Sequence, residues 1–272
     1  MGEAENMDVR AVTQIQQQVW SQGDFSVIGG MVVLTAELLA EAANVRAGER
    51  VLDVACGAGN TAIAAARRTW EPVVGLDYVP ELLERGRERA AAERFEIEFI
   101  EGDAQEMPFA DGEFDVVLST YGAMFAPDHQ RTADELLRAC RAGGRIGMAN
   151  WTPEGLVGEM FRTMAGHAPL PPGVTPPALW GTEEHLHELF GEGISELRTE
   201  RRHMTQRFRS AEHWIEVFRT WFGPVKMAFA RVGSDGEQSL HDDLVELLER
   251  HNVDQDTLVL PGEYLEVVAV KA

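Results

Sequence analysis

The stretch VLDVACGAGN, residues 51–60, is an apolar run of strand length that ends in two glycines one residue apart. Together with Ala62, Gly57 and Gly59 give the spacing G-x-G-x-x-G/A, which is typical of the first strand–loop–helix turn of dinucleotide-binding sheets. Glycines at such a turn allow the backbone to approach a bound ligand closely. The spacing predicts a ligand site after the first strand of an α/β sheet, but it does not distinguish a nicotinamide dinucleotide from another nucleoside.

The segments around this stretch alternate between strand-like and helix-like patterns, which indicates βαβ units and a parallel sheet. We predict strands at residues 50–55, 72–77, 95–100, 113–119, 145–151, 194–208 and 264–271. We predict helices from about residue 60, at 81–92, from 128 to the glycines at 143–144, and at 240–252, with two helical segments within 8–43. The proline-rich stretch 167–181 cannot form a helix or a central strand, so we interpret it as an excursion between the fifth and sixth strands.

Composition and charge exclude several classes of protein. The 272 residues carry a formal net charge of -21, so a nucleic acid would be repelled. The first ten residues have no apolar core of a secretory signal, and the apolar run at 27–36 is too short to cross a bilayer. Cys56 and Cys140 supply neither a disulfide framework nor a four-ligand metal set. We therefore expect a cytoplasmic protein with no metal and no membrane or nucleic-acid partner.

Three acidic residues are placed at the carboxyl ends of the first three strands. Asp53 lies inside the first strand, where a buried charge is costly unless it is paired and where it would repel a pyrophosphate. Asp77 ends the second strand and is suited to bind ribose hydroxyls, a role that serves NAD equally well. Asp103 follows the third strand, where it could accept a hydrogen bond from an adenine amino group. Each has a structural alternative, because Asp53 could accept from amides of its own loop, Asp77 could cap the next helix, and Asp103 could shape a turn.

The set VLDVACGAGN…VVGLDYVPELLERGRERA…EFIEGDAQEMPFADGEFDVVLSTYGAMFAPDHQRTADELLRACRAGGRIGMANW resembles the class I S-adenosylmethionine-dependent methyltransferases. It is most similar to the ubiquinone/menaquinone-biosynthesis type and its small-molecule relatives, over about residues 45–152. The resemblance implies an α/β, Rossmann-like, doubly wound and mostly parallel seven-stranded sheet with an antiparallel last strand. It also implies S-adenosylmethionine as cofactor. One departure is the sequence Tyr78-Val79-Pro80, where many relatives have a small hydroxyl residue two positions after the aspartate.

Carried onto this chain, the resemblance implies a role for nine residues. The methionine part would be surrounded by Asp53, Ala55, Gly57 and Gly59. The ribose would be held by Asp77 with Tyr78 beside the nucleoside, the adenine would be met by Asp103 and Ala104, and the cofactor would lie above Ser119.

We divide the chain into four parts on these grounds. Residues 1–44 are predicted to form an N-terminal helical lid and 45–152 the cofactor-binding core. Residues 153–193 are predicted to form a lid or substrate insertion, and 194–272 to complete the sheet.

Residues for the methyl acceptor are less well defined by the sequence. His129, after the fourth strand, is a candidate general base because histidine titrates near neutral pH, although it could equally be a solvent-facing residue of the first helical turn. Tyr121 is a candidate acceptor contact or a structural hydroxyl. His185 and His187 lie on different faces of a helix, so we expect no metal there. Candidates for the wall of the acceptor pocket are Trp20, Phe25, Met124, Phe125, Trp151 and Trp180.

The sequence thus predicts a methyltransferase that acts on a carbon, oxygen or nitrogen atom of a small, partly apolar acceptor. The expected acceptor is either a quinone precursor or a secondary metabolite. A homodimer is a possible assembly. One alternative is a protein that binds the cofactor without methylating or uses its sulfonium for another reaction. The other is an NAD-dependent oxidoreductase, which Asp53 disfavours. The YxxxK spacing of short-chain dehydrogenases is also absent, because the only lysines are Lys226 and Lys271.

Overall fold

The computed structural model describes residues 8–169 and 174–272, so residues 170–173 of the proline-rich stretch and 1–7 of the N-terminal segment lie outside the described residues. Seven strands form one sheet in the order β3-β2-β1-β4-β5-β7-β6. Strand β7 is antiparallel to both of its neighbours, whereas the pairs among β1 to β5 are parallel. The predicted doubly wound sheet with an antiparallel last strand is therefore confirmed. The strands are β1 Val51–Val54, β2 Val73–Asp77, β3 Ile97–Glu101, β4 Phe114–Thr120, β5 Cys140–Trp151, β6 Ile194–Phe208 and β7 Leu258–Lys271.

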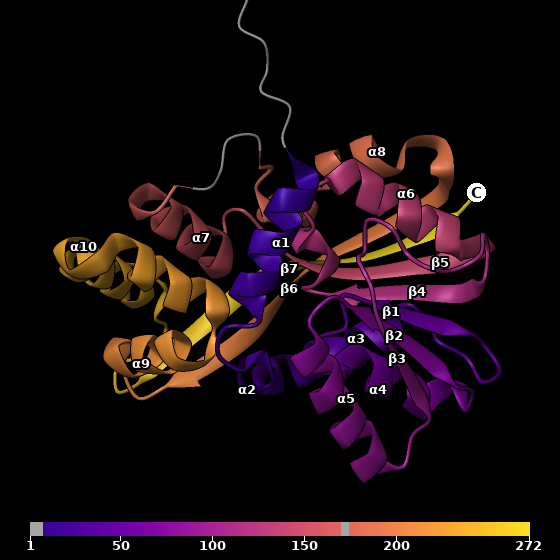
Figure 1. Ribbon diagram of the computed structural model, residues 1–272, viewed down its shortest axis with the longest axis horizontal. Coiled ribbons are helices and arrows are strands. Elements are labelled where there is room, and N and C mark those ends of the chain that lie inside the picture. The colour runs from indigo at the N-terminus through magenta and orange to yellow at the C-terminus, as the bar shows by residue number, and fades with distance from the viewer. Residues whose placement is uncertain (1–7, 170–173) are drawn as a thin grey trace, which may run out of the picture.

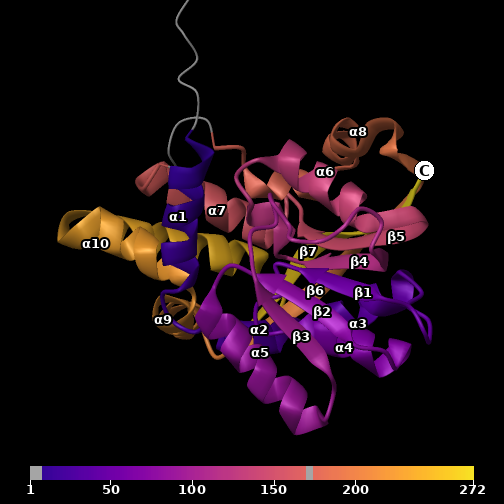
Figure 2. The same ribbon diagram turned by 45° about the vertical axis from the view of Figure 1, so that its right-hand side comes forward.

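Helices cover both faces of this sheet, and a second group of helices gathers at one end of it (Figure 1). Helices α3, α4 and α5 lie on one face, and α6 and α8 lie on the other. Helices α1, α7, α9 and α10 form the group at the end, where Figure 2 shows α1 crossing in front of α7 and α10. The bounds are α1 Val9–Trp20, α2 Phe25–Gly29, η1 Gly30–Val32, α3 Val33–Ala42, α4 Asn60–Thr69, α5 Pro80–Glu93, η2 Ala123–Phe125, α6 His129–Ala139, α7 Leu156–His167, η3 Pro177–Gly181, α8 Glu183–Phe190, η4 Gly191–Gly193, α9 Ala211–Trp221 and α10 Gly223–His251.

Three element boundaries differ clearly from the sequence-based expectation: the end of α6, the start of β5 at Cys140 rather than 145, and the start of β7. Helix α6 begins after Asp128, whose side chain caps it as predicted, but it ends at Ala139 rather than at the glycines 143–144. The cause is Cys140, which is extended and pairs with Phe114 of β4. Strand β7 begins at Leu258 rather than at 264, because residues 258–263 pair with the end of β6 beyond the reach of β5.

The helices α9 and α10 were not predicted over residues 210–232, where no element was assigned. Helix α9 begins after Ser210, whose side chain accepts a hydrogen bond from the backbone N–H of His213. The helix is held by stacking of Trp214 on Phe218, with ring centroids 3.7 Å apart. Helix α10 contains Gly233 at φ 60°, which bends it, and its second half matches the predicted helix at 240–252.

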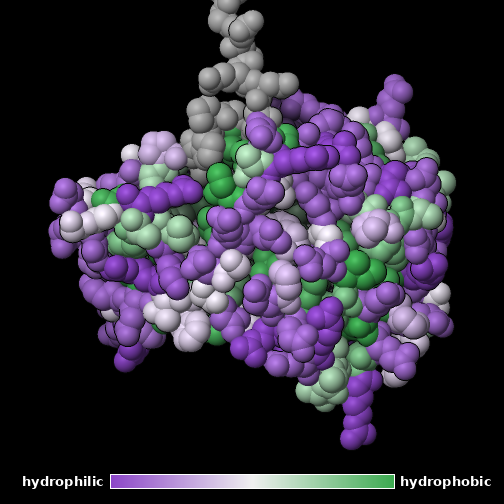
Figure 3. All heavy atoms as spheres, in the orientation of Figure 1, coloured by the Kyte–Doolittle hydropathy of each residue, from purple (hydrophilic) through white to green (hydrophobic). Residues whose placement is uncertain are grey.

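The surface seen in Figure 3 is mostly hydrophilic, in keeping with the high net charge. By length and composition, one segment of the described chain is apolar enough to cross a membrane, Phe25–Ala42. In the structure this segment is divided into α2, η1 and α3, and α3 packs against α4 and the sheet. The segment is therefore not one continuous helix, and 39% of it is buried inside the protein. The four predicted parts of the chain stay a prediction, and the part at 153–193 contains α7, η3 and α8.

Candidate active site

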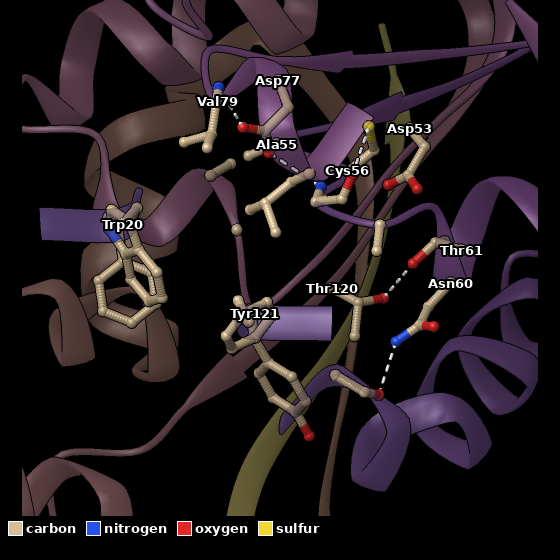
Figure 4. A pocket seen from close by; sticks show the side chains of 18 of the residues that line it. Trp20, Asp53, Ala55, Cys56, Asn60, Thr61, Asp77, Val79, Thr120 and Tyr121 are labelled. Atoms are coloured by element: carbon tan, nitrogen blue, oxygen red, sulfur yellow. Dashed lines mark hydrogen bonds between the residues drawn. The ribbon is translucent and has the colours of Figure 1, made fainter. Parts of the chain in front are cut away.

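A cavity lies at the carboxyl ends of β1, β2 and β4, where the sequence predicts a ligand site. It encloses about 810 Å³, counting the part open to solvent, a size that suits a small ligand or cofactor. Figure 4 shows side chains from the glycine turn, from the end of β2, from the loop after β4 and from α1 around it. Of the nine residues predicted for the cofactor, six line this cavity: Asp53, Ala55, Gly57, Asp77, Tyr78 and Ala104.

The glycine turn between β1 and α4 has three residues in the left-handed region. Ala55, Gly57 and Gly59 have φ values of 53°, 53° and 78°, a conformation that glycine adopts without steric cost. Gly59 does not line the cavity. A Cβ atom there would lie 2.9 Å from the ring of Phe99, so this glycine permits close packing of the turn on β3.

Asp53 is a buried carboxylate with one oxygen in use and one free. It is 1% exposed, its Oδ2 accepts a hydrogen bond of 2.8 Å from the backbone N–H of Ala62, and its Oδ1 is buried with no partner. Burial raises the pKa of this carboxyl well above its usual range, and the negative charge of Asp77 adds to the effect. A buried carboxylate oxygen without a partner is costly. The side chain therefore fits a ligand that brings a positively charged hydrogen-bond donor.

Asp77 ends β2 and ties the glycine turn to the next loop. Its Oδ2 accepts from the N–H of Gly57 at 2.8 Å, and its Oδ1 accepts from the N–H of Val79 at 2.9 Å. Burial raises its pKa to about 6 in spite of these bonds. Each oxygen keeps a lone pair for a further donor, so the group can still accept from ligand hydroxyls.

Ser119 and Asp103 do not line the cavity. The Ser119 hydroxyl donates to the carbonyl of Val54 at 2.8 Å and accepts from the N–H of Ala123 at 2.9 Å, which ties β4 to β1 and η2. The residue of β4 that lines the cavity is its neighbour, Thr120. Asp103 accepts from the N–H and the amide group of Gln105, as the predicted alternative of a turn aspartate requires.

A second cavity of about 570 Å³ adjoins the first. The two share Trp20, Phe25, Val32, Tyr121 and Phe125, so these side chains form the boundary between them. The remaining lining is almost entirely apolar: Ile28, Met31, Trp151, Leu156, Val157, Met160, Phe161, Met204, Gln206, Trp214, Phe218 and Phe222. This composition suits an apolar ligand.

Four of the six predicted wall residues line this second cavity, namely Trp20, Phe25, Phe125 and Trp151. The predicted placement of Met124 and Trp180 is wrong, because both are fully buried and neither is part of a cavity lining described here. Trp180 packs against His129 and Phe190 in the core between η3, α6 and α8.

Tyr121 stands at the boundary of the two cavities in a strained backbone conformation. Its φ is 55°, unusual for a residue with a side chain. Its ring stacks on that of Trp151 with centroids 3.8 Å apart, and its hydroxyl lies 3.4 Å from Oγ1 of Thr35. Burial raises the pKa of Tyr121 well above its usual value. The phenol therefore stays protonated at neutral pH.

The predicted placement of His129 beside the acceptor is wrong, and so is the alternative of a solvent-facing residue. His129 is buried and lines neither cavity. Its Nδ1 lies 2.9 Å from Nε2 of His185 on α8, and burial lowers its pKa to about 4. No group of three or more potential metal ligands occurs among residues 8–169 and 174–272.

Sequence reasoning missed the contribution of α7, β6 and α9 to the second cavity. Trp214, Phe218 and Phe222 follow one another at intervals of four residues, a spacing that places side chains on one face of a helix. This periodicity, preceded by Ser210 as a potential cap, is the signal that would have identified the α9 wall.

Comparison with known proteins agrees with this fold. Residues 51–144 match the methyltransferase domain family. The chain belongs to the class I S-adenosylmethionine-dependent methyltransferases and is an enzyme of methyl transfer.

Its similarity to individual proteins extends beyond that domain. The chain is 39% identical over 267 residues to an uncharacterised protein of Mycobacterium tuberculosis, with 96% of each chain covered. It is 37% identical over 121 residues to the demethylmenaquinone methyltransferase of Deinococcus radiodurans, covering 43% of this chain and 50% of that one. The crystal structure of YcgJ from Bacillus subtilis has the same fold, with a TM-score of 0.62 at 19% identity over 87% of this chain and 97% of that one.

Proposed function

We propose that the protein binds S-adenosylmethionine in the first cavity and transfers its methyl group to a small, largely apolar molecule in the second. The observation that carries this proposal is the free Oδ1 of Asp53, a buried carboxylate oxygen without a partner on a residue that lines the first cavity, next to an apolar cavity with which it shares five lining residues. The ammonium group of the cofactor is a donor of the required charge.

The other residues of the first cavity also fit this cofactor. Asp77 would accept from the ribose hydroxyls, with Tyr78 beside the nucleoside and Ala104 against the adenine. The glycine turn leaves room for the methionine part, since Ala55 and Gly57 line the cavity. Three predicted residues would act indirectly, by shaping the turns that present this lining: Gly59, Asp103 and Ser119.

The cofactor, when bound, supplies a methyl group activated by a sulfonium. The chain's own contribution is to hold the acceptor in line with it and to exclude water, and such positioning can account for a large share of a rate enhancement. Tyr121 is the only titratable side chain among the described residues that line the second cavity. Because its phenol stays protonated, it can donate a hydrogen bond but cannot accept a proton at neutral pH. The proposed acceptor therefore arrives with an atom that is already nucleophilic, such as an acidic phenol or enol.

Calorimetry with S-adenosylmethionine, S-adenosylhomocysteine and NADH tests the cofactor. We expect the first two to bind and NADH not to bind, and tight NADH binding without binding of either sulfur compound would overturn the proposal. Mass spectrometry with methyl-deuterated S-adenosylmethionine across a panel of phenols, quinones and amines then tests the reaction. A labelled product identifies the acceptor class, whereas cofactor binding with no labelled product from any class favours a protein that does not methylate.

A further inference from the structure

Gln206 is the one side-chain amide in the lining of the second cavity. It lies on β6 opposite Leu260 of β7 and is 5% exposed. Apart from Gln206 and Tyr121, the described lining residues are aliphatic, aromatic or methionine. A polar group in such surroundings is stable only when its hydrogen bonds are made.

The orientation of the Gln206 amide is fixed by Trp214. The indole Nε1 donates a hydrogen bond of 2.8 Å to Oε1 of Gln206. An indole N–H can only donate, so the amide oxygen must face it and the amide nitrogen must point elsewhere. Swapping the two amide atoms would set donor against donor.

The amide nitrogen is left without a protein partner. Within residues 8–169 and 174–272, no hydrogen bond from Nε2 of Gln206 to another residue is found, whereas its oxygen is used. The two N–H groups therefore need an acceptor from outside the protein. Nε2 is not among the fully buried atoms without a partner, so water in the cavity can accept from it in the free enzyme, and a ligand oxygen would replace that water.

We propose that Gln206 selects the methyl acceptor by donating a hydrogen bond to an uncharged carbonyl oxygen of an otherwise largely apolar molecule. This proposal rests on the proposed function of the two cavities. The oxygen that Gln206 contacts is uncharged because no charged side chain occurs among the described residues of the second cavity, so a carboxylate or phosphate there would have no counter-ion from the protein. A phenolate or enolate at the reacting atom would have its counter-ion in the sulfonium of the cofactor.

A matched pair of probes isolates this hydrogen bond. 2-Acetylnaphthalene and 2-ethylnaphthalene have similar shapes, but only the first carries an oxygen. Their dissociation constants are measured by quenching of tryptophan fluorescence, with and without S-adenosylhomocysteine, in the wild type and in Gln206→Met. The preference for the ketone is expressed as the ratio of the two dissociation constants. We expect this ratio to fall about threefold to tenfold in the variant, which is the change expected for the loss of one hydrogen bond. Any loss of packing affects both probes and cancels in the ratio. Gln238→Met on the exposed face of α10 is the control and should leave the ratio unchanged.

A second measurement needs no variant. With a ¹³C-labelled carbonyl, the infrared stretch of bound 2-acetylnaphthalene should lie at lower frequency in the wild type than in an apolar solvent. If Gln206→Met unfolds because the Trp214 indole loses its partner, the double variant Gln206→Met/Trp214→Phe removes both groups and serves instead.

An unchanged ratio in a folded variant, or a carbonyl stretch like that in an apolar solvent, would overturn the proposal. Tighter binding of 2-naphthoate than of the ketone would also overturn it. Failure of the proposed function is distinguishable, because it shows in calorimetry with S-adenosylmethionine and in the mass-spectrometric assay. Because Gln206 lines the second cavity and not the first, a change in the probe ratio on Gln206→Met reports on the second cavity whether or not the cofactor binds.

Discussion

Replacing Asp53 with asparagine should strengthen the ligand-free fold while it weakens cofactor binding. The substitution preserves size and keeps an oxygen to accept from the N–H of Ala62, as Oδ2 does at 2.8 Å. It replaces the unpartnered Oδ1 with an uncharged amide NH2 group. Because burial raises the pKa of Asp53, its ionised form is disfavoured in the folded protein relative to the unfolded chain. Removing the charge therefore should not lower the free energy of unfolding at neutral pH.

The effect on binding follows from the number of hydrogen bonds at stake. One Asp53 oxygen is occupied by Ala62, so one free oxygen remains for the ammonium group of the cofactor. A hydrogen bond to a charged group contributes about 1.5–3 kcal/mol. At about 1.4 kcal/mol for each factor of ten, the dissociation constant for S-adenosylhomocysteine should rise roughly 10- to 100-fold.

The pH dependence of the unfolding free energy gives an independent test of whether the Asp53 charge destabilises the fold. With a raised pKa in the folded state, the native protein binds more protons than the unfolded chain above the usual pKa of an aspartate, so the unfolding free energy falls as pH rises through that window. The variant lacks this contribution. The difference in unfolding free energy between Asp53→Asn and the wild type, measured by urea denaturation, should therefore grow from pH 4 upward until the pH exceeds the raised pKa.

The assay combines urea denaturation with calorimetry of S-adenosylhomocysteine binding. Asp128→Asn is the matched control, because Asp128 caps α6 outside both cavities and asparagine caps equally well. A less stable Asp53→Asn with an unchanged dissociation constant would show that Asp53 supports the fold and does not bind the ligand. That result would refute the argument from the free oxygen.

Three further predictions concern the surroundings of the cavities. Gly122→Ala should destabilise the protein by about 1–3 kcal/mol, because the new Cβ would lie 2.3 Å from the carbonyl oxygen of Ala55. Gly30→Ala, which adds a Cβ in open space, is its control, and equal melting temperatures would contradict the clash. Because the pKa of His129 falls from 6.5 to about 4 in the fold, acidification through that range should cost about 3 kcal/mol of unfolding free energy. His129→Leu should remove that dependence in urea melts at pH 7 and pH 4.5, and a persisting slope would assign it to other groups. Gln17→Ala should speed dissociation of S-adenosylhomocysteine in stopped flow, since this side chain ties α1 to the loop after β2, and an unchanged rate would show that α1 does not hold the cavity closed.

The parts of the fold that the sequence predicted are those with local signals. Strands β1 to β5 are short apolar runs bounded by turns, and each contains or overlaps its predicted range. The residues of the glycine turn and of the β2 end are likewise contiguous with strands, and five of them line the first cavity, although their contact with a cofactor stays a prediction. Asp77 illustrates the reason, because its position depends only on where β2 ends.

The errors concern side chains whose direction depends on distant segments. His129 was predicted to face the acceptor from its place after β4, but helix α6 turns it toward His185, 56 residues further along the chain. Trp180 was predicted to line a pocket because its segment is an insertion, yet η3 folds inward and buries it completely. An aromatic residue has the same sequence signal in a core as in a cavity wall, so only tertiary packing separates the two.

The contrast between local signals and contacts of distant segments also explains why the family match informs about the methyl donor more than about the acceptor. Apart from Trp20, Phe25, Gly29 and Val32, the lining of the first cavity falls within residues 51–144, the range that matches the methyltransferase domain family. Of the described residues that line the second cavity, only Tyr121 and Phe125 fall within it. A shared domain therefore carries information about the methyl donor and almost none about the acceptor. The chemistry of the acceptor has to be inferred from the segments outside that range, which are α1, α2, η1, the end of β5, α7, β6 and α9. Among the lining residues of these segments, Gln206 has the one side-chain amide, and its nitrogen has no partner among the described residues.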